Sequence, residues 1–380
     1  MTTKTIKDAV HDHIRVDEFA LDLLDTPEMQ RLRHVRQLGT AYLVYPSANH
    51  TRFEHSLGVY HLAVQALDNL GVGGTERDEV RAAALLHDVG HTPFSHNTED
   101  VIEEHVGKRH DEVEDILEGN VARVLEERGL SPERVAALIR GEGRYGQLVS
   151  GELDVDRMDY LVRDAHHTGV PYGTIDNRRL VLELDFVGDE LVLGEGNVQT
   201  AEALLLARAL MHPTVYSHHV ARISKAMLKR ATERLIEGGV DAGRVRRMDD
   251  HELVVALRNS DTTGEMGKRL AERRLYKRAV WKPRDEVPSG SLDAEPRELE
   301  REIADAAGVE PHEVIVDVST PPRMAETEAS VVVDGEKRRL EGVSPLVKTL
   351  MEVHEEGWKF GVYAPERSLD DVEKASERVV

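Results

Sequence analysis

The chain has 380 residues, of which 40% are apolar, 4% are aromatic and none is cysteine, so disulfides and thiolate chemistry are excluded. Its formal net charge of −22 repels phosphate backbones, which argues against a nucleic acid as a main partner. No apolar run approaches the roughly 20 residues of a membrane span, and the N-terminus lacks the apolar stretch of a signal peptide, so we expect a cytoplasmic protein with no membrane contact.

Helices dominate the predicted structure from residue 25 to about residue 278. Apolar side chains recur at helical spacing over residues 51–67 and 77–89, and Ser131-Pro132 is a typical helix start. A hairpin is predicted where LVLELDF (180–186) and LVLGE (191–195) flank a short turn. Helices are expected again over residues 199–238 and 249–278.

A change of composition follows, because proline, glycine and serine gather over residues 283–296 as in a linker. Beyond it, the patterns predict strands over 312–320 and 358–366, a hairpin with an Asp-Gly turn over 329–341, and helices over 344–357 and 368–379. We therefore predict a mainly α protein with a helical domain (1–285), a linker (286–296) and a small α+β domain (297–380).

The segment LLHDVGHTPFSH indicates a metal centre. His87 and Asp88 end an apolar helix, and burying either group without a partner costs several kcal/mol. A divalent metal would serve both, with His55 upstream and Asp156 downstream as further ligands, since each is a polar residue within apolar helical periodicity. Imidazole and carboxylate donors together suit Fe, Mn, Ni, Co or Zn, and Mg remains a candidate.

Polar side chains are also spaced four residues apart on two helices, which places each set on one helix face. A solvated face is the simpler interpretation, but aromatic residues and apolar surroundings favour a pocket. The two sets are Asp156, Tyr160 and Asp164, and Arg208, His212 and Tyr216. Pro213 lies within the second set and predicts a kink there.

Long motifs between about Lys4 and Met227 resemble those of the HD-domain deoxynucleoside triphosphate triphosphohydrolases. They are DTPEMQRLRHVRQLGTAYLVYP, NHTRFEHSLG, HDVGHTPFSH, DVDRMDYLVRDAHHTG and RALMHPTVYSHH. The resemblance implies a helical HD-domain fold with the metal ligands named above. It further implies hydrolysis of dNTPs to deoxynucleoside and inorganic triphosphate by a homo-oligomer, either a dimer or a tetramer.

The same resemblance assigns roles to individual residues. Catalytic roles fall to His91, His96 and His110, and Glu99 stands where the family has an aspartate. The implied substrate-binding residues are Arg52, Arg157 and Arg208 for phosphates, Gln37, Leu38, Tyr160, Asp164 and Tyr216 for the sugar, and His212 beside them.

A regulatory site is a further implication of the resemblance. Lys4, Asp25, Gln30 and Arg33 match residues that bind an activating guanine nucleotide between subunits. The alternative is structural, because Asp-Thr-Pro is a good helix start and Gln-Arg-Leu-Arg an ordinary exposed face.

Two other functions stay open. One is an HD phosphohydrolase for a nucleoside monophosphate, a cyclic nucleotide or (p)ppGpp, and the other is a nucleotide sensor or scaffold with a vestigial site. Four further histidines are expected to be ordinary structural residues: His11, His13, His251 and His354.

Overall fold

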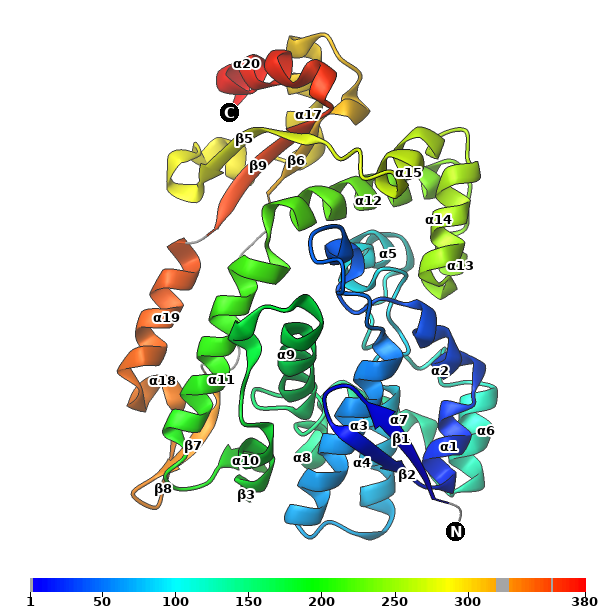
Figure 1. Ribbon diagram of the computed structural model, residues 1–380, viewed down its shortest axis with the longest axis vertical. Coiled ribbons are helices and arrows are strands. Elements are labelled where there is room, and N and C mark those ends of the chain that lie inside the picture. Colours follow the sequence, from blue (N-terminus) through cyan, green and yellow to red (C-terminus); the bar gives the residue numbers. More distant parts are fainter. Residues whose placement is uncertain (1–2, 319–327, 357) are drawn as a thin grey trace.

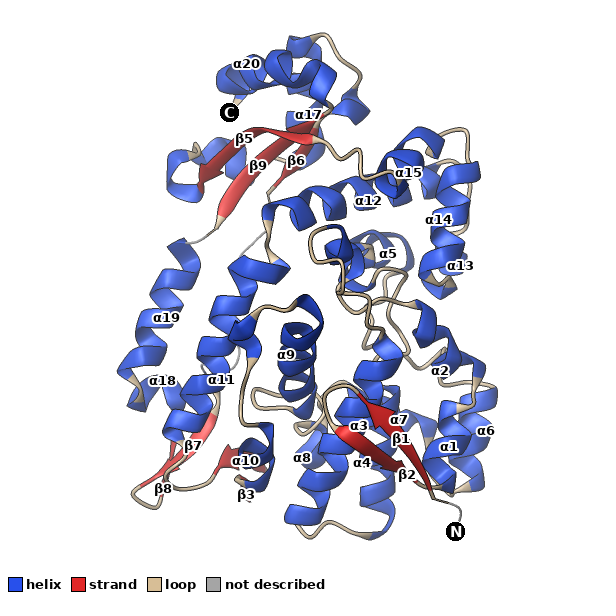
Figure 2. Ribbon diagram, in the orientation of Figure 1, coloured by secondary structure: helices blue, strands red, loops and turns tan. Residues whose placement is uncertain are grey.

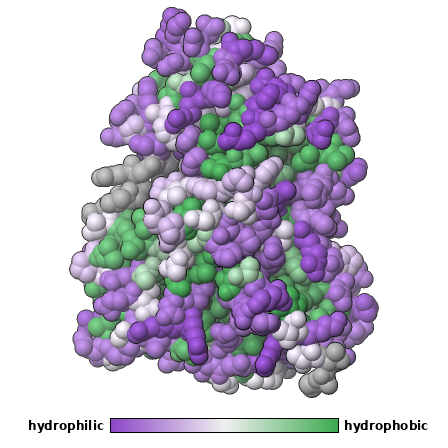
Figure 3. All heavy atoms as spheres, in the orientation of Figure 1, coloured by the Kyte–Doolittle hydropathy of each residue, from purple (hydrophilic) through white to green (hydrophobic). Residues whose placement is uncertain are grey.

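The computed structural model describes residues 3–318, 328–356 and 358–380. Within these residues the chain is mainly helical, with small two-, three- and four-stranded sheets, which confirms the predicted fold class (Figure 1, Figure 2). None of the described helices is long and apolar enough to cross a bilayer. Hydrophilic side chains predominate on the face drawn in Figure 3, as the charge of −22 requires.

A bundle of four helices forms the main core: α3 (Arg52–Asn69), α4 (Gly74–Leu86), α7 (Pro132–Ile139) and α9 (Val155–Thr168). Helix α3 packs against both α4 and α9, and α4 packs against α7. The predicted start of α7 is confirmed, since the Ser131 side chain accepts a hydrogen bond from the Arg134 amide. Helix α4 ends at Leu86, three residues earlier than predicted, so His87 and Asp88 lie in the turn that follows.

An N-terminal hairpin, absent from the sequence prediction, lies beside this bundle. Strands β1 (Lys4–Asp8) and β2 (Asp12–Val16) pair in antiparallel register across a tight turn. The shorter helices around the bundle are α1 (Glu18–Leu24), α2 (Pro27–Arg31), α5 (Glu99–Val106), α6 (Asn120–Glu127), α8 (Gly143–Gly146) and α10 (Asn177–Leu182).

The long helix predicted over residues 199–238 is interrupted. Helix α11 (Val198–Met211) passes into a π-helical turn over His212–Tyr216 before α12 (His219–Glu237) begins. The kink predicted from Pro213 is thereby confirmed, because proline lacks the amide that would continue the α-helical bonds. Helices α13 (Ala242–Arg247), α14 (Asp250–Asn259) and α15 (Gly264–Ala271) follow.

The predicted hairpin at residues 180–195 is shorter than expected, because Leu180–Leu182 end α10 instead of extending a strand. Strands β3 (Leu184–Val187) and β4 (Glu190–Leu193) pair antiparallel. Strand β7 (Ser330–Val333) joins β4 in parallel and carries β8 (Glu336–Arg339) at the sheet edge. Helices α18 (Leu340–Val343) and α19 (Pro345–Glu356) follow, and both pack against α11.

The second mixed region contains strands β5 (Lys277–Pro283), β9 (Lys359–Ala364) and β6 (Ile315–Asp317), paired in that order. Helix α16 (Ser289–Asp293) falls within the predicted linker, while α17 (Pro296–Ala307) and α20 (Leu369–Val379) pack together beside the sheet. Strand pairing crosses the predicted boundary at 286–296 twice, through β5 with β9 and β4 with β7. A division into two domains there stays a prediction. Residues 319, 320 and 357 of the predicted elements lie outside the described residues.

Candidate active site

The four predicted metal ligands meet at one point. His55 comes from the first turn of α3, His87 and Asp88 from the end of α4, and Asp156 from the first turn of α9. The Nε2 atom of His55 lies 2.8 Å from an Asp156 oxygen, 3.3 Å from His87 Nε2 and 3.8 Å from an Asp88 oxygen. Ligands bonded at about 2.1 Å to one tetrahedral or octahedral ion are about 3.0–3.4 Å apart, so these four donors fit a single ion.

Both imidazoles are held in the tautomer that a metal requires. The Nδ1–H of His55 donates to Asp159 Oδ2 at 2.7 Å, and that of His87 donates to the Ala84 carbonyl at 2.9 Å. Each ring therefore turns its Nε2 atom toward the shared point. Hydrogen bonds of this kind orient metal-bound histidines and raise their basicity.

The charges around this point also favour a cation. Burial would lower the pKa of His55, but its hydrogen bonds with Asp156 and Asp159 outweigh burial and raise the pKa to about 10. A proton held so tightly shows that the carboxylates attract positive charge strongly. The side chain of Asp156 is 33% exposed, which opens the centre to solvent on one side.

Asp159 is the inner member of a buried network that the sequence prediction missed. Its carboxylate accepts from the Arg163 guanidinium at 2.8 and 3.0 Å, and Arg163 continues to Asp8 of β1 at 2.9 Å. His11, in the β1–β2 turn, also contacts Asp159 at 2.6 Å. His11, expected to be an ordinary hydrogen-bonded residue, lies in the hairpin turn and contacts the same carboxylate that His55 does.

Close packing of α3 on α9 keeps the Asp159 carboxylate in place. A Cβ at Gly58 would overlap with the Asp159 carboxylate and lie 2.6 Å from Arg163 Nη2. Only glycine permits this approach, which explains a glycine inside α3 one turn after His55.

Arg52, predicted to bind phosphate, lies against the metal ligands. Its Nη1 donates to both oxygens of Asp88, at 2.9 and 3.0 Å, and its Nε donates to the Ser95 hydroxyl at 2.8 Å. The Arg52 and His87 charges oppose the effect of burial on Asp88 and hold its pKa well below its usual range. Asp88 is thus ionised, as a metal ligand must be.

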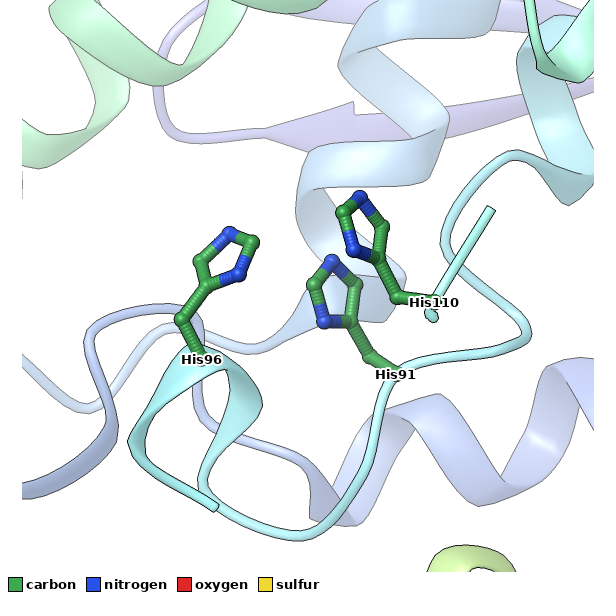
Figure 4. A group of neighbouring side chains, drawn as sticks. All are labelled: His91, His96 and His110. Carbon is green, nitrogen blue, oxygen red and sulfur yellow. The ribbon is translucent and has the colours of Figure 1, made fainter. Parts of the chain in front are cut away.

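The predicted catalytic histidines His91, His96 and His110 form one group (Figure 4). His91 Nε2 lies 3.2 Å from Asp88 Oδ1. Glu99 bridges the other two rings, with one oxygen 2.5 Å from His96 Nδ1 and the other on His110 Nδ1. The His91 and His110 rings stack at 4.3 Å, nearly parallel, so their in-plane lone pairs run side by side. A metal ion bound by one of these two rings would lie in the plane of that ring, so a single ion cannot lie in the planes of both His91 and His110. The three histidines are therefore better suited to proton transfer than to binding one ion.

Glu99 stands where the resemblance predicted an aspartate, and its longer arm reaches both rings. Burial would raise the pKa of Glu99, but the hydrogen bonds with His110 and His96 reverse the effect and lower it. The His96 side chain is 55% exposed, in contrast to the buried His91. Of the three imidazoles, His96 is therefore the one most open to a ligand from solvent.

The substrate residues predicted on α9 and around the π turn also lie together. The Tyr216 hydroxyl donates to one Asp164 oxygen at 2.9 Å, and His50, a residue not predicted for the site, contacts the other at 2.8 Å. The Tyr160 ring lies edge-on to Tyr216 with centroids 6.3 Å apart. Burial raises the pKa of Tyr160, and the nearby charge of Arg208 opposes this effect.

The other predicted substrate residues lie at the edges of this group. Gln37 is buried, and its backbone amide donates to the His50 carbonyl at 3.1 Å. Leu38 is partly buried against the main core. Arg157 bonds to Asp154 and to the Gly151 carbonyl. His212 lines a cleft of about 840 Å³ with Tyr216 and Ser217.

The four predicted regulatory residues are only partly brought together. Arg33 Nε donates to Gln30 Oε1 at 2.8 Å, and the exposed Asp25 ends the helix just before them. Lys4 begins β1, on a separate element. The Arg33 guanidinium lies over the Phe53 ring, 3.6 Å from its centroid.

The four predicted metal ligands and the predicted catalytic residues lie in a part of the chain that matches a known family model. Residues 52–164 match the family model described as the HD domain, and residues 175–380 match the HD associated region. An uncharacterized protein of Methanocaldococcus jannaschii is 33% identical over 97% of this chain and 81% of its own length.

Two further proteins carry names that concern activity. A deoxynucleoside triphosphate triphosphohydrolase SAMHD1 homolog of Dictyostelium discoideum is 32% identical over 60% of this chain, but this chain matches only 48% of that protein. The crystal structure of a phosphohydrolase from Bacteroides thetaiotaomicron superimposes with a TM-score of 0.78 at 26% identity, covering 96% of this chain and all of the other.

Proposed function

Because the chain belongs to the HD-domain family of phosphohydrolases, we propose that it hydrolyses deoxynucleoside triphosphates to a deoxynucleoside and inorganic triphosphate. The observation that carries this proposal is the face of α9 that bears Asp156, Tyr160 and Asp164. Asp156 contacts the predicted metal ligand His55 and Asp164 contacts Tyr216, about 12 Å further along the helix axis, which leaves room for a phosphate and a sugar between the two carboxylates.

The phosphate end of this face is the metal centre. A divalent ion held by His55, His87, Asp88 and Asp156 would polarise a phosphoryl oxygen and lower the pKa of water. The proposal assigns charge neutralisation to Arg157 and Arg208, with a guanidinium fork suited to phosphate oxygens. Arg52 would contribute through Nη2, which takes part in neither of its contacts with Asp88 and Ser95.

The leaving group requires a proton, and the proposed source is the cluster of His91, His96 and His110. In the reaction a bond forms between water oxygen and the α-phosphorus, and the bond from that phosphorus to the sugar 5′-oxygen breaks. We assign proton donation to the 5′-oxygen to His96, because it is exposed and its other nitrogen is held by Glu99. His110 and His91 lie beside His96 and would return to it the proton that the attacking water loses, which restores the donor.

The sugar end is the cluster around Asp164. Its carboxylate, fixed between Tyr216 and His50, is placed to accept a hydrogen bond from the 3′-hydroxyl, while the Tyr216 and Tyr160 rings offer flat apolar surfaces to the sugar. Gln37 and Leu38 would close the other side of the sugar. His212 and the cleft beside it are assigned to the base.

We also propose a regulatory nucleotide site and a homo-oligomeric assembly. Asp25, Gln30 and Arg33 present a carboxylate, an amide and a guanidinium on neighbouring turns, groups that can pair with a guanine edge and its phosphates. With Lys4 they form the proposed guanine-nucleotide site, which would favour a homo-oligomeric active state.

Product analysis tests the function. The full chain, loaded with Mn²⁺, is incubated with each dNTP in turn, with and without GTP, and the products are separated by ion exchange. We expect deoxynucleoside and intact triphosphate in equal amounts. Orthophosphate or pyrophosphate as the product would contradict the proposal and point to another nucleotide phosphoester. The His87→Ala/Asp88→Ala double variant should lose both activity and bound metal while keeping its helical circular dichroism.

A further inference from the structure

The first residue of helix α14 is hydrogen-bonded to the turn that carries His96 (residues 92–97, the His96 turn). Asp250 is the first residue of α14, and it is fully buried. Its Oδ1 accepts a hydrogen bond from the Phe94 amide at 2.6 Å. Its Oδ2 accepts from the Arg36 amide at 3.1 Å and from the Arg36 guanidinium at 3.2 Å. One carboxylate therefore joins three segments that are far apart in the sequence.

The His96 turn needs such support because its backbone is strained. Phe94 and Ser95 have φ angles of 60° and 57°, in the left-handed region that side chains other than glycine rarely adopt. Such conformations persist only when surrounding contacts hold them. The Ser95 hydroxyl donates to the Arg36 carbonyl at 2.7 Å. Asp250 therefore restrains Phe94, and Arg36 restrains Ser95.

The carboxylate also reaches the sugar side of the site. Arg36 precedes Gln37, and an isolated bridge pairs Arg36 with Thr51, the residue before Arg52. A change at Asp250 would therefore move the His96 turn and the Gln37 segment relative to each other, although Asp250 itself contacts neither His96 nor Gln37 in the described structure.

Helix capping does not explain this residue. Asp249 is the N-cap of α14, where its side chain accepts from the Glu252 amide at 2.8 Å and the Glu252 carboxylate accepts from the Asp249 amide at 3.0 Å. Asp250 does not cap the helix. The hydrogen bonds of its buried carboxylate go to Phe94 in the His96 turn and to Arg36.

We propose that Asp250 is a positioning residue, which fixes the His96 turn against the Gln37 segment so that the proton donor and the sugar contact meet the same nucleotide. This inference rests on the proposed function for its catalytic consequence. Its structural part, the restraint of the His96 turn, does not depend on the substrate.

The test compares Asp250→Asn with Asp249→Ala in the full chain, using two readouts. In Asp250→Asn, amide exchange over residues 92–97 should become at least about 10-fold faster. The kcat should fall roughly 100-fold, the effect of about 1 Å of misplacement, with KM within about threefold. Asp249→Ala removes the helix cap, so it should lower the melting temperature and leave both kcat and exchange over 92–97 unchanged.

The outcomes separate the proposals. If Asp250→Asn shows the amide exchange and kcat of the wild type, the positioning role is overturned. It is also overturned if Asp250→Asn and Asp249→Ala lose kcat in the same proportion to their loss of melting temperature. If Asp250→Asn does not fold, Arg36→Met, which removes the guanidinium bond to Asp250 and keeps the bond from the Arg36 amide, should speed exchange over 92–97 and lower kcat several-fold; no change would overturn the role. If the wild type hydrolyses no dNTP, the proposed function fails, and amide exchange still decides the restraint.

Discussion

His55 and Asp159 share a 2.7 Å hydrogen bond between Nδ1 and Oδ2, and neither side chain reaches solvent. The bond orients a proposed metal ligand from a helix that also supplies the proposed ligand Asp156. Because Asp159 is held in turn by Arg163 and His11, the N-terminal hairpin supports the proposed metal centre.

Asp159→Asn should weaken metal binding without removing a ligand. Loss of such a hydrogen-bonding partner lowers metal affinity about 10- to 100-fold. The measurement is calorimetric titration of the chelator-stripped chain with Mn²⁺. Asp8→Asn is the matched control, because it removes another buried carboxylate from Arg163 without touching His55, and its metal affinity should stay within a few-fold of wild type. Equal affinities for Asp159→Asn and wild type would refute the role of this bond.

Gly58→Ala should disturb the same bond by volume alone. The added methyl overlaps with the Asp159 carboxylate, so we expect a loss of about 1–3 kcal/mol in the free energy of unfolding, together with weaker Mn²⁺ binding. Gly342→Ala in α18 is the control, because a Cβ there meets nothing within 4 Å. Denaturant unfolding and Mn²⁺ titration check both variants. A Gly58→Ala protein with unchanged metal affinity would mean that Asp159 can move without consequence.

The four proposed metal ligands can be singled out in the sequence because each interrupts an apolar helical pattern. Three segments with this property, in the order His55, His87-Asp88, Asp156, leave few other interpretations. The supporting residues lack such a signal. Asp159 and Arg163 look like ordinary charges of an exposed helix face, and His11 lies in a hairpin that the sequence prediction missed altogether.

The fold shows the same division between local and long-range information. Caps and periodicity predicted α3, α7, α19 and α20, since these features are local. Pairing of β4 with β7 joins residues about 138 apart, and nothing in either strand identifies its partner. The pairing of Asp250 with Phe94 is equally distant in sequence. Contacts of this kind depend on how the whole chain packs, so sequence patterns could not reveal them.

Asp25→Ala should abolish activation by GTP while leaving the bound metal and the basal rate intact. The side chain is exposed at the end of α1, remote in sequence from the metal ligands, and its carboxylate is the group proposed to pair with a guanine edge. Asp22→Ala, on the same helix and also exposed, is the control and should retain activation. Rates with and without GTP, and metal content, are the measurements. A wild-type enzyme that GTP does not activate would remove the regulatory proposal.

Asp250 should make the free energy of unfolding depend on pH. Burial raises the pKa of its carboxyl to about 6, although the Phe94 and Arg36 hydrogen bonds oppose the rise; the unfolded value is about 3.9. The folded state therefore holds this proton more tightly than the unfolded state. Its contribution to stability is complete below pH 4 and is lost as pH rises from about 4 to about 6, a total of about 3 kcal/mol.

The change is best measured as a difference between two proteins, because other groups titrate in the same range. Urea unfolding of wild type and Asp250→Asn, from pH 4 to 7.5, should show the wild type losing up to about 3 kcal/mol relative to the variant as pH rises. The variant cannot ionise at this position, while the remaining titrating groups are common to both proteins. A constant difference across the range would show that the Asp250 carboxyl titrates normally, and that its hydrogen bonds with Phe94 and Arg36 fully offset its burial.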